Sequence, residues 1–319
     1  VNQTMGTLGT PFIWGATNSW GGIRCRNFQY NQCEYADDIE PERIDEIAEE
    51  TMGPYHMTGC FGCQVHCRAQ YKIPEGPYAG RYDEGPDYTA QAAFGGETDT
   101  PRALTVLVGN HLTNQYGVDN LEIGSTISWA MELYEEGILT DKDTDGVDLR
   151  FGNDEAVIEM IDRICLRKGY LGDLLAEGGI LASEKIGKGS FDYLIQVKGM
   201  QNLQSDERAT PGLALNIATS SRGSDHLRSR PDIDLYHLPE DVLRRIYSSP
   251  VPYDGPLSSK HTAYEGKAWP VFWQENCFMG VDSLGICKYH TTFLGATLPN
   301  YEDWSKVLYH NCGLEMTPE

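Results

Sequence analysis

Three cysteines within eight residues constrain this chain more than any other feature: Cys60, Cys63 and Cys67 have the spacing C-x2-C-x3-C. Thiolates this close in sequence can converge on one metal centre and leave one position for a distant residue. Soft sulfur ligands select an iron–sulfur cluster or zinc. Zinc ribbons normally pair two C-x2-C hairpins, and the sequence has one. The pattern favours an iron–sulfur cluster. A zinc site that uses His66 and a set of buried structural cysteines are the alternatives.

The chain has nine cysteines, so a fourth ligand must come from the others. These are Cys25, Cys33, Cys165, Cys277, Cys287 and Cys312. Cys165 lies on the apolar stripe of an expected helix, where a buried, inert thiol is typical. Cys287 follows Gly285 in a tight turn after an apolar stretch. On chemistry alone Cys287 leads, but the choice stays open at this point.

The bulk composition narrows the class of protein. A length of 319 residues suits two domains. The net charge of −22 argues against nucleic-acid binding, which needs clustered Lys and Arg. It also means that an acidic electron carrier must dock on a local basic patch or belong to a permanent complex. No stretch reaches the roughly 20 apolar residues of a membrane-spanning helix, and no signal peptide is present at the start. We expect a cytoplasmic protein without membrane insertion, in a reducing compartment.

Hydrophobic periodicity predicts mainly helices. We expect helices at residues 40–52, 122–136 and 173–186, and one that begins after Asn153 and ends at Gly169. Residues 193–197 indicate a short strand, and residues 1–35 indicate an irregular segment. A change of composition at residues 198–212 places a domain boundary there. Val1 and the helix-start sequence 317–319 suggest an interior piece of a longer polypeptide.

Four segments, taken in order, resemble a known family. They are CFGCQVHC (60–67), EGPDY (84–88), SRGSDHLR (221–228) and DSLGICK (282–288). Together they are similar to the tungsten-containing aldehyde:ferredoxin oxidoreductases, and the similarity covers essentially the whole chain. The resemblance implies a mainly α fold of two helical domains with few short strands. Residues 1–200 would be the cluster-bearing second domain and residues 201–319 a truncated third domain. The N-terminal β domain, which forms a base for the pterins, would be absent.

The resemblance also implies the cofactors and the residues that hold them. Cys60, Cys63, Cys67 and Cys287 match the ligands of a [4Fe–4S] cluster. The family's pterin-binding pattern, D-x-x-G-L-(C/D), occurs twice. The implied pterin contacts are Asn114, Val118, Asp119, Asp282, Ile286 and Cys287, with Arg228 as a basic contact. Ile286 replaces the leucine of the pattern and Asn114 replaces its first aspartate. The cofactor would be a tungsten or molybdenum bis-pyranopterin, with which Mg²⁺ can be associated. Asp119 could instead be a helix N-cap.

His226 and Glu84 match the acid–base residues near the metal, with Asp87 as a substitute for Glu84. Residues 26–28 (Arg-Asn-Phe) resemble a substrate-side loop. The implied reaction is oxidation of an aldehyde to a carboxylic acid, with electrons leaving to ferredoxin or to ferredoxin-like subunits. A homo-oligomer is compatible with this reaction. Two alternatives remain: a related tungsten reductase of the benzoyl-CoA type, and a non-catalytic iron–sulfur subunit for electron transfer or scaffolding.

Overall fold

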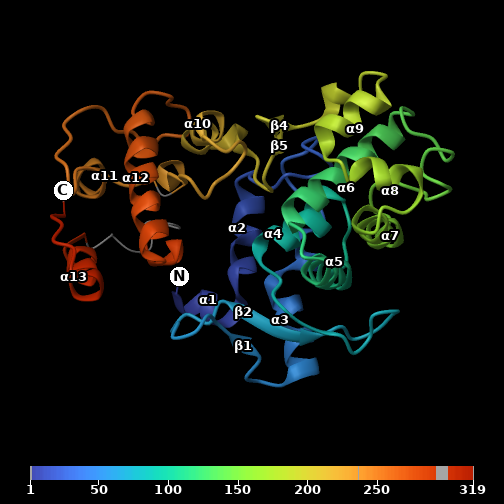
Figure 1. Ribbon diagram of the computed structural model, residues 1–319, viewed down its shortest axis with the longest axis horizontal. Helices are drawn as coiled ribbons and strands as arrows, with labels where there is room; N and C mark the ends of the chain where they lie inside the picture. Colours follow the sequence, from blue (N-terminus) through green and yellow to red (C-terminus); the bar gives the residue numbers. More distant parts are fainter. Residues whose placement is uncertain (1, 236, 292–300, 319) are drawn as a thin grey trace. The chain divides into compact units, whose positions relative to one another are not determined.

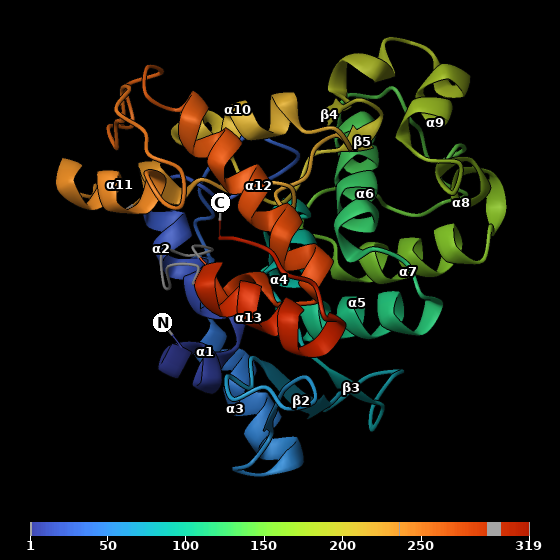
Figure 2. The same ribbon diagram turned by 60° about the vertical axis from the view of Figure 1, so that its left-hand side comes forward.

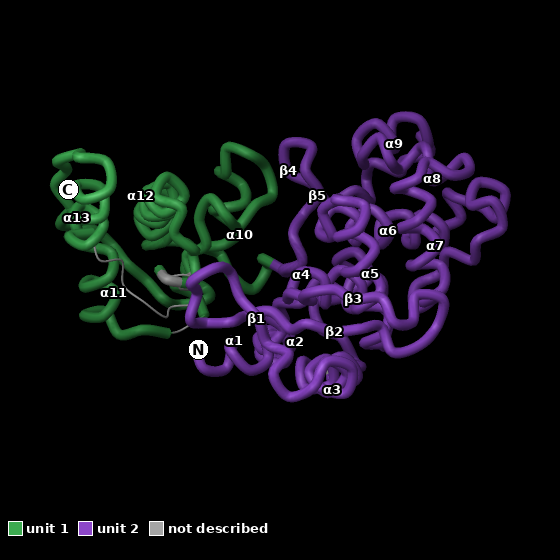
Figure 3. The backbone as a smooth tube through the Cα atoms, turned by 60° about the horizontal axis from the view of Figure 1, so that its bottom comes forward, with its two compact units in different colours: residues 1, 207–319 green, residues 2–206 purple. Residues whose placement is uncertain are grey.

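The computed structural model describes residues 2–235, 237–291 and 301–318. These residues form many helices and a few short strands, which confirms the expected mainly α fold. The chain divides into two compact units, and we describe each by itself (Figure 3). The N-terminal unit comprises residues 2–206, and the C-terminal unit comprises the described residues from 207 onward. Within the described ranges, no helix is both long and apolar enough to cross a membrane.

The N-terminal unit consists of nine α-helices and two small antiparallel sheets among its described residues (Figure 1). The helices are α1 (Asn2–Leu8), α2 (Trp14–Ser19), α3 (Pro41–Met52), α4 (Tyr88–Gln91), α5 (Ala103–Tyr116), α6 (Asn120–Glu135), α7 (Asp154–Cys165), α8 (Gly169–Leu175) and α9 (Gly179–Ile186). The strands are β1 (Met57–Thr58), β2 (Arg68–Lys72), β3 (Tyr82–Glu84), β4 (Gln196–Val197) and β5 (Met200–Gln201). Short helical turns connect them at Thr10–Ile13, Ala36–Ile39, Ala92–Glu97 and Ser190–Tyr193.

The helices begin and end where local chemistry directs them. Pro41 occupies the first turn of α3, where its missing N–H costs nothing. The side chain of Asn153 accepts a hydrogen bond from the Ala156 N–H and caps α7. Helices α5 to α8 pack against one another around a large apolar core, to which α3 and β2 also contribute. Figures 1 and 2 show α5, α6 and α7 side by side.

Three local predictions differ from the structure. Residues 1–35 contain α1, a helical turn and α2, because a run of small and apolar residues folds around Trp14 without a strong periodic signal. The single helix expected at 173–186 is two helices, α8 and α9, since Gly178 adopts φ 86° and breaks the chain direction. The strand expected at 193–197 is reduced to β4, which pairs with β5.

A three-stranded sheet places the cysteines and Glu84. Its order is β1-β2-β3, with Met57 opposite Ala69 and Tyr71 opposite Asp83. Side chains of β2 alternate between exposed and buried, and fully buried Tyr71 donates a hydrogen bond of 2.8 Å to the Leu107 carbonyl of α5. The sheet is thereby fixed to the helical core.

The C-terminal unit is helical throughout its described residues. Its elements are a turn at Glu207–Ala209, α10 (Pro211–Thr219), a turn at Asp232–Asp234, α11 (Glu240–Tyr247), α12 (Ala268–Leu284), a turn at Lys288–His290 and α13 (Tyr301–Cys312). Helices α10 and α11 both contact α12 (Figure 2). The ammonium of buried Lys267 pairs with Asp234 and donates to two backbone carbonyls, which ties the loop at 258–260 to the start of α12.

Candidate functional site

Three of the four predicted cluster cysteines, Cys60, Cys63 and Cys67, lie in the loop that joins β1 to β2, whereas Cys287 follows α12 in the C-terminal unit. Cys60 is exposed, whereas Cys63 and Cys67 are half-buried. Two residues of this loop, Gly62 and His66, have positive φ values of 73° and 53° and let the loop curl. The Cys63 N–H donates to the Cys60 carbonyl at 2.9 Å. The loop is therefore a compact, solvent-facing turn.

The donor chemistry of this loop fits an iron–sulfur cluster. The Val65 N–H points at Cys63 Sγ, 3.4 Å away, and such hydrogen bonds stabilise thiolates and tune cluster potentials. Helix α1 packs closely on the loop, because a Cβ added at Gly6 would lie 2.7 Å from the Val65 carbonyl oxygen. In the described parts of the chain, no three or more His, Cys, Asp or Glu side chains gather closely enough to hold a single metal ion.

The other cysteines have different surroundings. Cys25 and Cys33 are both 3 % exposed and belong to a small core cluster with Trp14. The Cys33 thiol beside it and burial both raise the pKa of Cys25, which favours a neutral thiol. Cys277 is buried within α12, and Cys165 is half-buried on α7. Only Cys287 and Cys312 are exposed among the six candidates for a fourth ligand.

Glu84 ends β3, and three side chains on one face of α5 hold the backbone around it. Asn110 donates to the Glu84 carbonyl oxygen at 3.1 Å. His111 and Asn114 both contact the neighbouring Asp83, at 2.8 and 2.9 Å. Buried Asp83 also accepts from the Glu84 N–H at 2.8 Å. The structure therefore brings two predicted site residues, Glu84 and Asn114, to the same place through Asp83.

The carboxylate of Glu84 itself stays accessible. Its side chain is 41 % exposed, accepts a hydrogen bond from the Tyr82 hydroxyl at 3.0 Å, and lies 3.9 Å from the Arg68 guanidinium. Asp87, the substitute for Glu84, has a different task here, because its carboxylate accepts from the Ala90 N–H and caps α4. Both acidic residues are reachable from solvent, and Asp87 differs in that its carboxylate also caps a helix.

The first copy of the pterin pattern, residues 114–119, is a helix C-terminus. Helix α5 ends at Gly117, which adopts φ 67°. The Gly117 N–H donates to the Asn114 carbonyl and the Val118 N–H donates to the Thr113 carbonyl, at 3.2 and 3.1 Å. This pair of hydrogen bonds defines a Schellman motif. Val118 and Asp119 are exposed, and Asp119 caps α6 through the Leu121 N–H, as the sequence alternative proposed.

The second copy, residues 282–287, has the same construction at the end of α12. Gly285 adopts φ 67°, its N–H donates to the Asp282 carbonyl, and the Ile286 N–H donates to the Val281 carbonyl. Cys287 then has an extended backbone and precedes the helical turn at Lys288–His290. The glycine of the pattern is explained directly, since it occupies the left-handed position of the motif.

A depression of about 230 Å³ lies between α12 and the segment 221–228 of the C-terminal unit. Its lining includes Arg228 and Asp282, two predicted cofactor contacts. The full lining is Thr219, Ser221, Leu227, Arg228, Glu275, Phe278, Met279 and Asp282. The Arg228 guanidinium lies 3.6 Å from the Asp282 carboxylate, which also pairs with Lys288. Two cations beside a carboxylate and an apolar floor at Phe278 suit a polar, anionic ligand with a flat ring.

His226 lies in the segment beside this depression. Burial, followed by the nearby cations Arg230, Arg222 and Lys288, lowers the pKa of His226 to about 3. The imidazole is therefore neutral at physiological pH. A neutral imidazole can donate a hydrogen bond from one nitrogen and accept one at the other. Asp225 is buried next to it, pairs with Arg222 at 2.6 Å, and accepts from the Leu227 N–H.

The predicted substrate-side loop is held by polar contacts to other parts of the N-terminal unit. Arg26, Asn27 and Phe28 have consecutive positive φ values of 45°, 49° and 69°. Arg26 binds Glu135 at 2.8 Å, and Asn27 is 3 % exposed and donates to Glu132 at 2.6 Å. These contacts provide a structural role for Arg26 and Asn27.

Sequence reasoning missed Asp83, because its position in the acidic run 83–87 makes it look like an exposed loop residue. Its burial comes from its place in the middle of β3, between two less buried residues. Sequence reasoning also missed the buried Arg24–Glu97 ion pair of 2.7 Å, in which burial raises the pKa of Glu97 to about 7.

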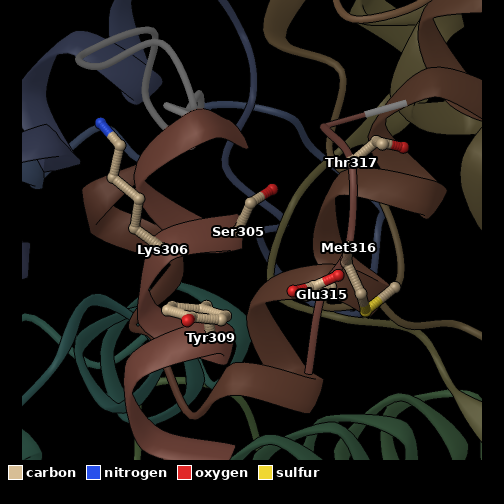
Figure 4. Close-up of a pocket in the computed structure, with 6 residues that line it drawn as sticks. All are labelled: Ser305, Lys306, Tyr309, Glu315, Met316 and Thr317. Atoms are coloured by element: carbon tan, nitrogen blue, oxygen red, sulfur yellow. The ribbon is translucent and has the colours of Figure 1, made fainter. Parts of the chain in front are cut away.

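A second depression, of about 480 Å³, lies between α13 and residues 315–317 and contains none of the predicted site residues (Figure 4).

Comparison with known proteins supplies a family for this geometry. The family model described as "Aldehyde ferredoxin oxidoreductase, domains 2 & 3" matches residues 1–319. The tungsten-containing aldehyde ferredoxin oxidoreductase of Pyrococcus horikoshii is 29 % identical over 98 % of this chain and 46 % of its own length. The enzyme of the same name from Pyrococcus furiosus is 26 % identical with the same coverage. The chain thus spans about half the length of these curated relatives.

Two further similarities concern proteins with other names. The aliphatic sulfonate oxidoreductase, WOR-like subunit, of Pyrococcus furiosus is 30 % identical over 52 % of this chain and 27 % of its own length. The active site complex BamBC of benzoyl coenzyme A reductase has the same fold, with a TM-score of 0.73 over 99 % of this chain and 48 % of that chain, at 19 % identity. The match over all 319 residues shows that the chain belongs to the aldehyde ferredoxin oxidoreductase family and corresponds to its domains 2 and 3.

Proposed function

We propose that this chain is the cluster-bearing and pterin-contacting part of an oxidoreductase that converts aldehydes to carboxylic acids. The observation that carries the proposal is the pair of matching turns at 114–119 and 282–287, the second of which ends in an exposed cysteine. Membership of the family and the names of the similar Pyrococcus enzymes support the reaction class. Ferredoxin, or ferredoxin-like subunits, would be the electron acceptor.

The proposed ligands of a [4Fe–4S] cluster are Cys60, Cys63, Cys67 and Cys287. A tungsten or molybdenum bis-pterin centre held there would supply two-electron redox chemistry, and a cluster on these cysteines would supply one-electron transfer. We include Mg²⁺ in the proposal as an ion associated with the pterin cofactor. The residues proposed to hold the pterins are Asn114, Val118, Asp119, Arg228, Asp282, Ile286 and Cys287. Arg228 and Lys288 would bind anionic groups of the cofactor, and the exposed backbone of each turn would offer hydrogen bonds.

The proposed acid–base residues have complementary chemistry. His226 is neutral because its pKa is about 3, so its N–H would donate to the aldehyde oxygen and polarise the carbonyl without giving up a proton. Glu84 would take the proton of the attacking water. Its backbone is held by Asn110 and Asp83, and this rigidity limits the motion of the carboxylate. The Tyr82 hydroxyl donates to this carboxylate at 3.0 Å, and the Arg68 guanidinium lies 3.9 Å from it.

The experiment that tests the proposal uses the full-length protein that contains this chain. Elemental analysis, pterin detection and a panel of aldehydes with a redox dye are measured on one anaerobic preparation. We expect tungsten or molybdenum, about four irons per chain and aldehyde-dependent dye reduction. Iron without tungsten or molybdenum would identify an electron-transfer subunit. Pterin and tungsten without any aldehyde activity would favour a reductase. Stoichiometric zinc in place of iron contradicts all three.

A paired variant separates catalysis from assembly. His226→Ala should retain the cluster absorbance and the metal content but lose turnover by at least about a hundredfold. The matched control is His310→Ala, which removes an exposed imidazole on α13 and should leave turnover unchanged. Normal turnover in the His226 variant would show that the acid–base assignment is wrong.

A further inference from the structure

Two histidines of the C-terminal unit, His237 and His261, face each other at the surface. Their Nε2 atoms lie 2.9 Å apart, and their ring centroids are 4.4 Å apart with an interplanar angle of 73°. His237 is exposed and His261 is half-buried. Neither belongs to the depression beside Arg228 or to any segment that carries the family resemblance.

The hydrogen bond of His261 fixes its tautomer. Its Nδ1 lies 3.2 Å from the Ala209 carbonyl oxygen, which can only accept a hydrogen bond. The proton of neutral His261 is therefore on Nδ1, and the lone pair is on Nε2, which points toward His237. Metal-binding histidines have the same arrangement, because an Nδ1–H bound to a backbone carbonyl orients the ring and raises the basicity of Nε2.

The distances between the rings match two cis ligands of one metal ion. Two imidazole nitrogens about 2.1 Å from a metal and at right angles lie about 3.0 Å apart, with ring centroids about 4.6 Å apart. The observed values are 2.9 and 4.4 Å. A collinear hydrogen bond between the rings would separate the centroids by about 5.2 Å, since both nitrogens would then lie on the line between the centroids. The rings are therefore angled more like chelating ligands than like a linear donor and acceptor.

We propose that His237 and His261 form a binding site for one divalent first-row transition-metal ion, with water completing the coordination. Imidazole ligands suit Ni²⁺, Cu²⁺ and Zn²⁺, and exclude Mg²⁺ and Ca²⁺, which prefer oxygen. Metal binding needs His237 to carry its proton on Nδ1 instead of Nε2, a tautomer exchange that changes no net charge. The chain's net charge of −22 raises the local concentration of cations.

The site would fasten two loops of the C-terminal unit. His237 has a left-handed backbone with φ 44°, which is costly for a residue other than glycine, and it follows the turn at Asp232–Asp234. His261 lies in the long loop before α12, which Lys267 also anchors. An ion held by both imidazoles would restrain this loop at a second point. The site has two protein ligands among the described residues, so the ion would be exchangeable.

The test is a Ni²⁺ titration of the tag-free protein by calorimetry at pH 7.5, under anaerobic conditions. We expect one Ni²⁺ site that His237→Ala and His261→Ala each weaken by at least about tenfold, and that His310→Ala leaves unchanged. Thiol binding contributes equally to every variant, so the imidazole site is measured as the difference between them. The affinity should fall on acidification, because protonated imidazole cannot bind a metal.

A second measurement does not depend on the variants. In the wild-type protein, Ni²⁺ should broaden the imidazole NMR signals of His237 and His261 before those of His56, whose ring is held by Asp45 at 2.7 Å. A titration in which these two signals stay sharp overturns the proposal. A nickel titration that both alanine substitutions leave identical to that of the wild-type protein does so as well.

Discussion

The turn at residues 114–119 and the turn at residues 282–287 have one backbone geometry and two different surroundings. In both, a glycine at φ 67° ends a helix, and two N–H groups donate to the same two carbonyl positions. The residues that follow, Asp119 and Cys287, are both extended. The first turn faces a buried carboxylate, because the Asn114 amide donates to Asp83. The second faces cations, because Asp282 pairs with Arg228 and Lys288.

The sequence pattern therefore specifies the backbone conformation of the turn and does not specify which ligand the turn binds. The glycine and the two hydrogen bonds are required by the Schellman motif wherever it occurs. The first and last residues differ between the two copies, and with them the charge of the site. An amide at residue 114 suits its neighbour, since a carboxylate there would repel Asp83.

The largest predicted effect comes from a substitution of the last residue of each turn, Cys287 in one and Asp119 in the other. Cys287→Ser should abolish the visible absorbance of the cluster and all cluster-dependent electron transfer, because serine is a poor ligand for iron. Asp119→Ala removes the cap of α6 and should lower the free energy of unfolding by about 1 kcal/mol, with the cluster retained. Both are measured by absorbance and urea denaturation.

Cys312→Ser is the control for the cysteine substitution, since Cys312 is the other exposed candidate and lies on α13. If the Cys312 variant lost the cluster and the Cys287 variant kept it, the ligand assignment would be reversed and the functional difference between the two turns would disappear.

The second prediction changes the first residue of each turn. Asn114→Asp replaces a 2.9 Å hydrogen bond to Asp83 with a repulsion between carboxylates, and should destabilise the N-terminal unit by about 2 kcal/mol at pH 7. The loss should diminish on acidification, because protonation of one carboxyl removes the repulsion. Asn114→Ala, which removes the hydrogen bond without adding charge, should cost about half as much.

The reciprocal change, Asp282→Asn, removes a charge from a partly exposed group with two cationic partners. Exposed ion pairs contribute little, so the free energy of unfolding should change by less than about 1 kcal/mol. Equal effects of Asn114→Asp and Asp282→Asn would contradict the difference in surroundings between the turns.

Local chemistry made much of the fold predictable. The capping residues Asn153 and Asp119 and the first-turn Pro41 specify helix starts through contacts within a few residues, so they could be identified without the structure. The break at Gly178 between α8 and α9 could not, because a glycine inside an apolar run is compatible with both a continuous helix and a turn. Helix α1 was missed because it is fixed by its packing on the cysteine loop.

The candidate site was predictable only in part. The two turns and the cysteines are identifiable because each is a short segment whose residue types have a local requirement. The support of Glu84 by Asn110, His111 and Asn114 depends on the pairing of β3 with β2 and of the sheet with α5, which involves contacts between residues far apart in sequence. Likewise, the low pKa of His226 arises from burial and from cations such as Arg230 and Lys288 that tertiary structure brings near.

The third prediction concerns the cations around the second turn. His226 has a folded pKa of about 3, whereas an unfolded chain takes up that proton near pH 6.5. The unfolded state therefore binds more protons at acid pH, and stability that is fully present above about pH 6.5 is lost as the pH falls. Between pH 7 and 5.5 the loss should be at most about 1.4 kcal/mol.

Other groups titrate in the same range, so the measurement is the difference between the wild-type protein and His226→Gln in urea denaturation at each pH. The variant should lack this part of the pH dependence. A Lys288→Gln variant should retain it, because burial is the largest cause of the low pKa of His226 and Lys288 is the smallest. Identical pH profiles for the wild-type protein and the His226 variant would show that the imidazole is not shielded.

The smallest predicted effect tests the shared backbone itself. Gly117→Ala and Gly285→Ala each force a side chain into a left-handed conformation, at a cost of about 1 kcal/mol. A Cβ added at either glycine meets no neighbouring atom within 4 Å, so packing contributes nothing and the two costs should agree. Urea denaturation of both variants gives the comparison directly. If the cost at Gly285 exceeded the cost at Gly117 by more than about 1 kcal/mol, the two turns would differ in backbone strain as well as in charge. Equal costs would leave the side chains at the first and last positions as the source of their different chemistry.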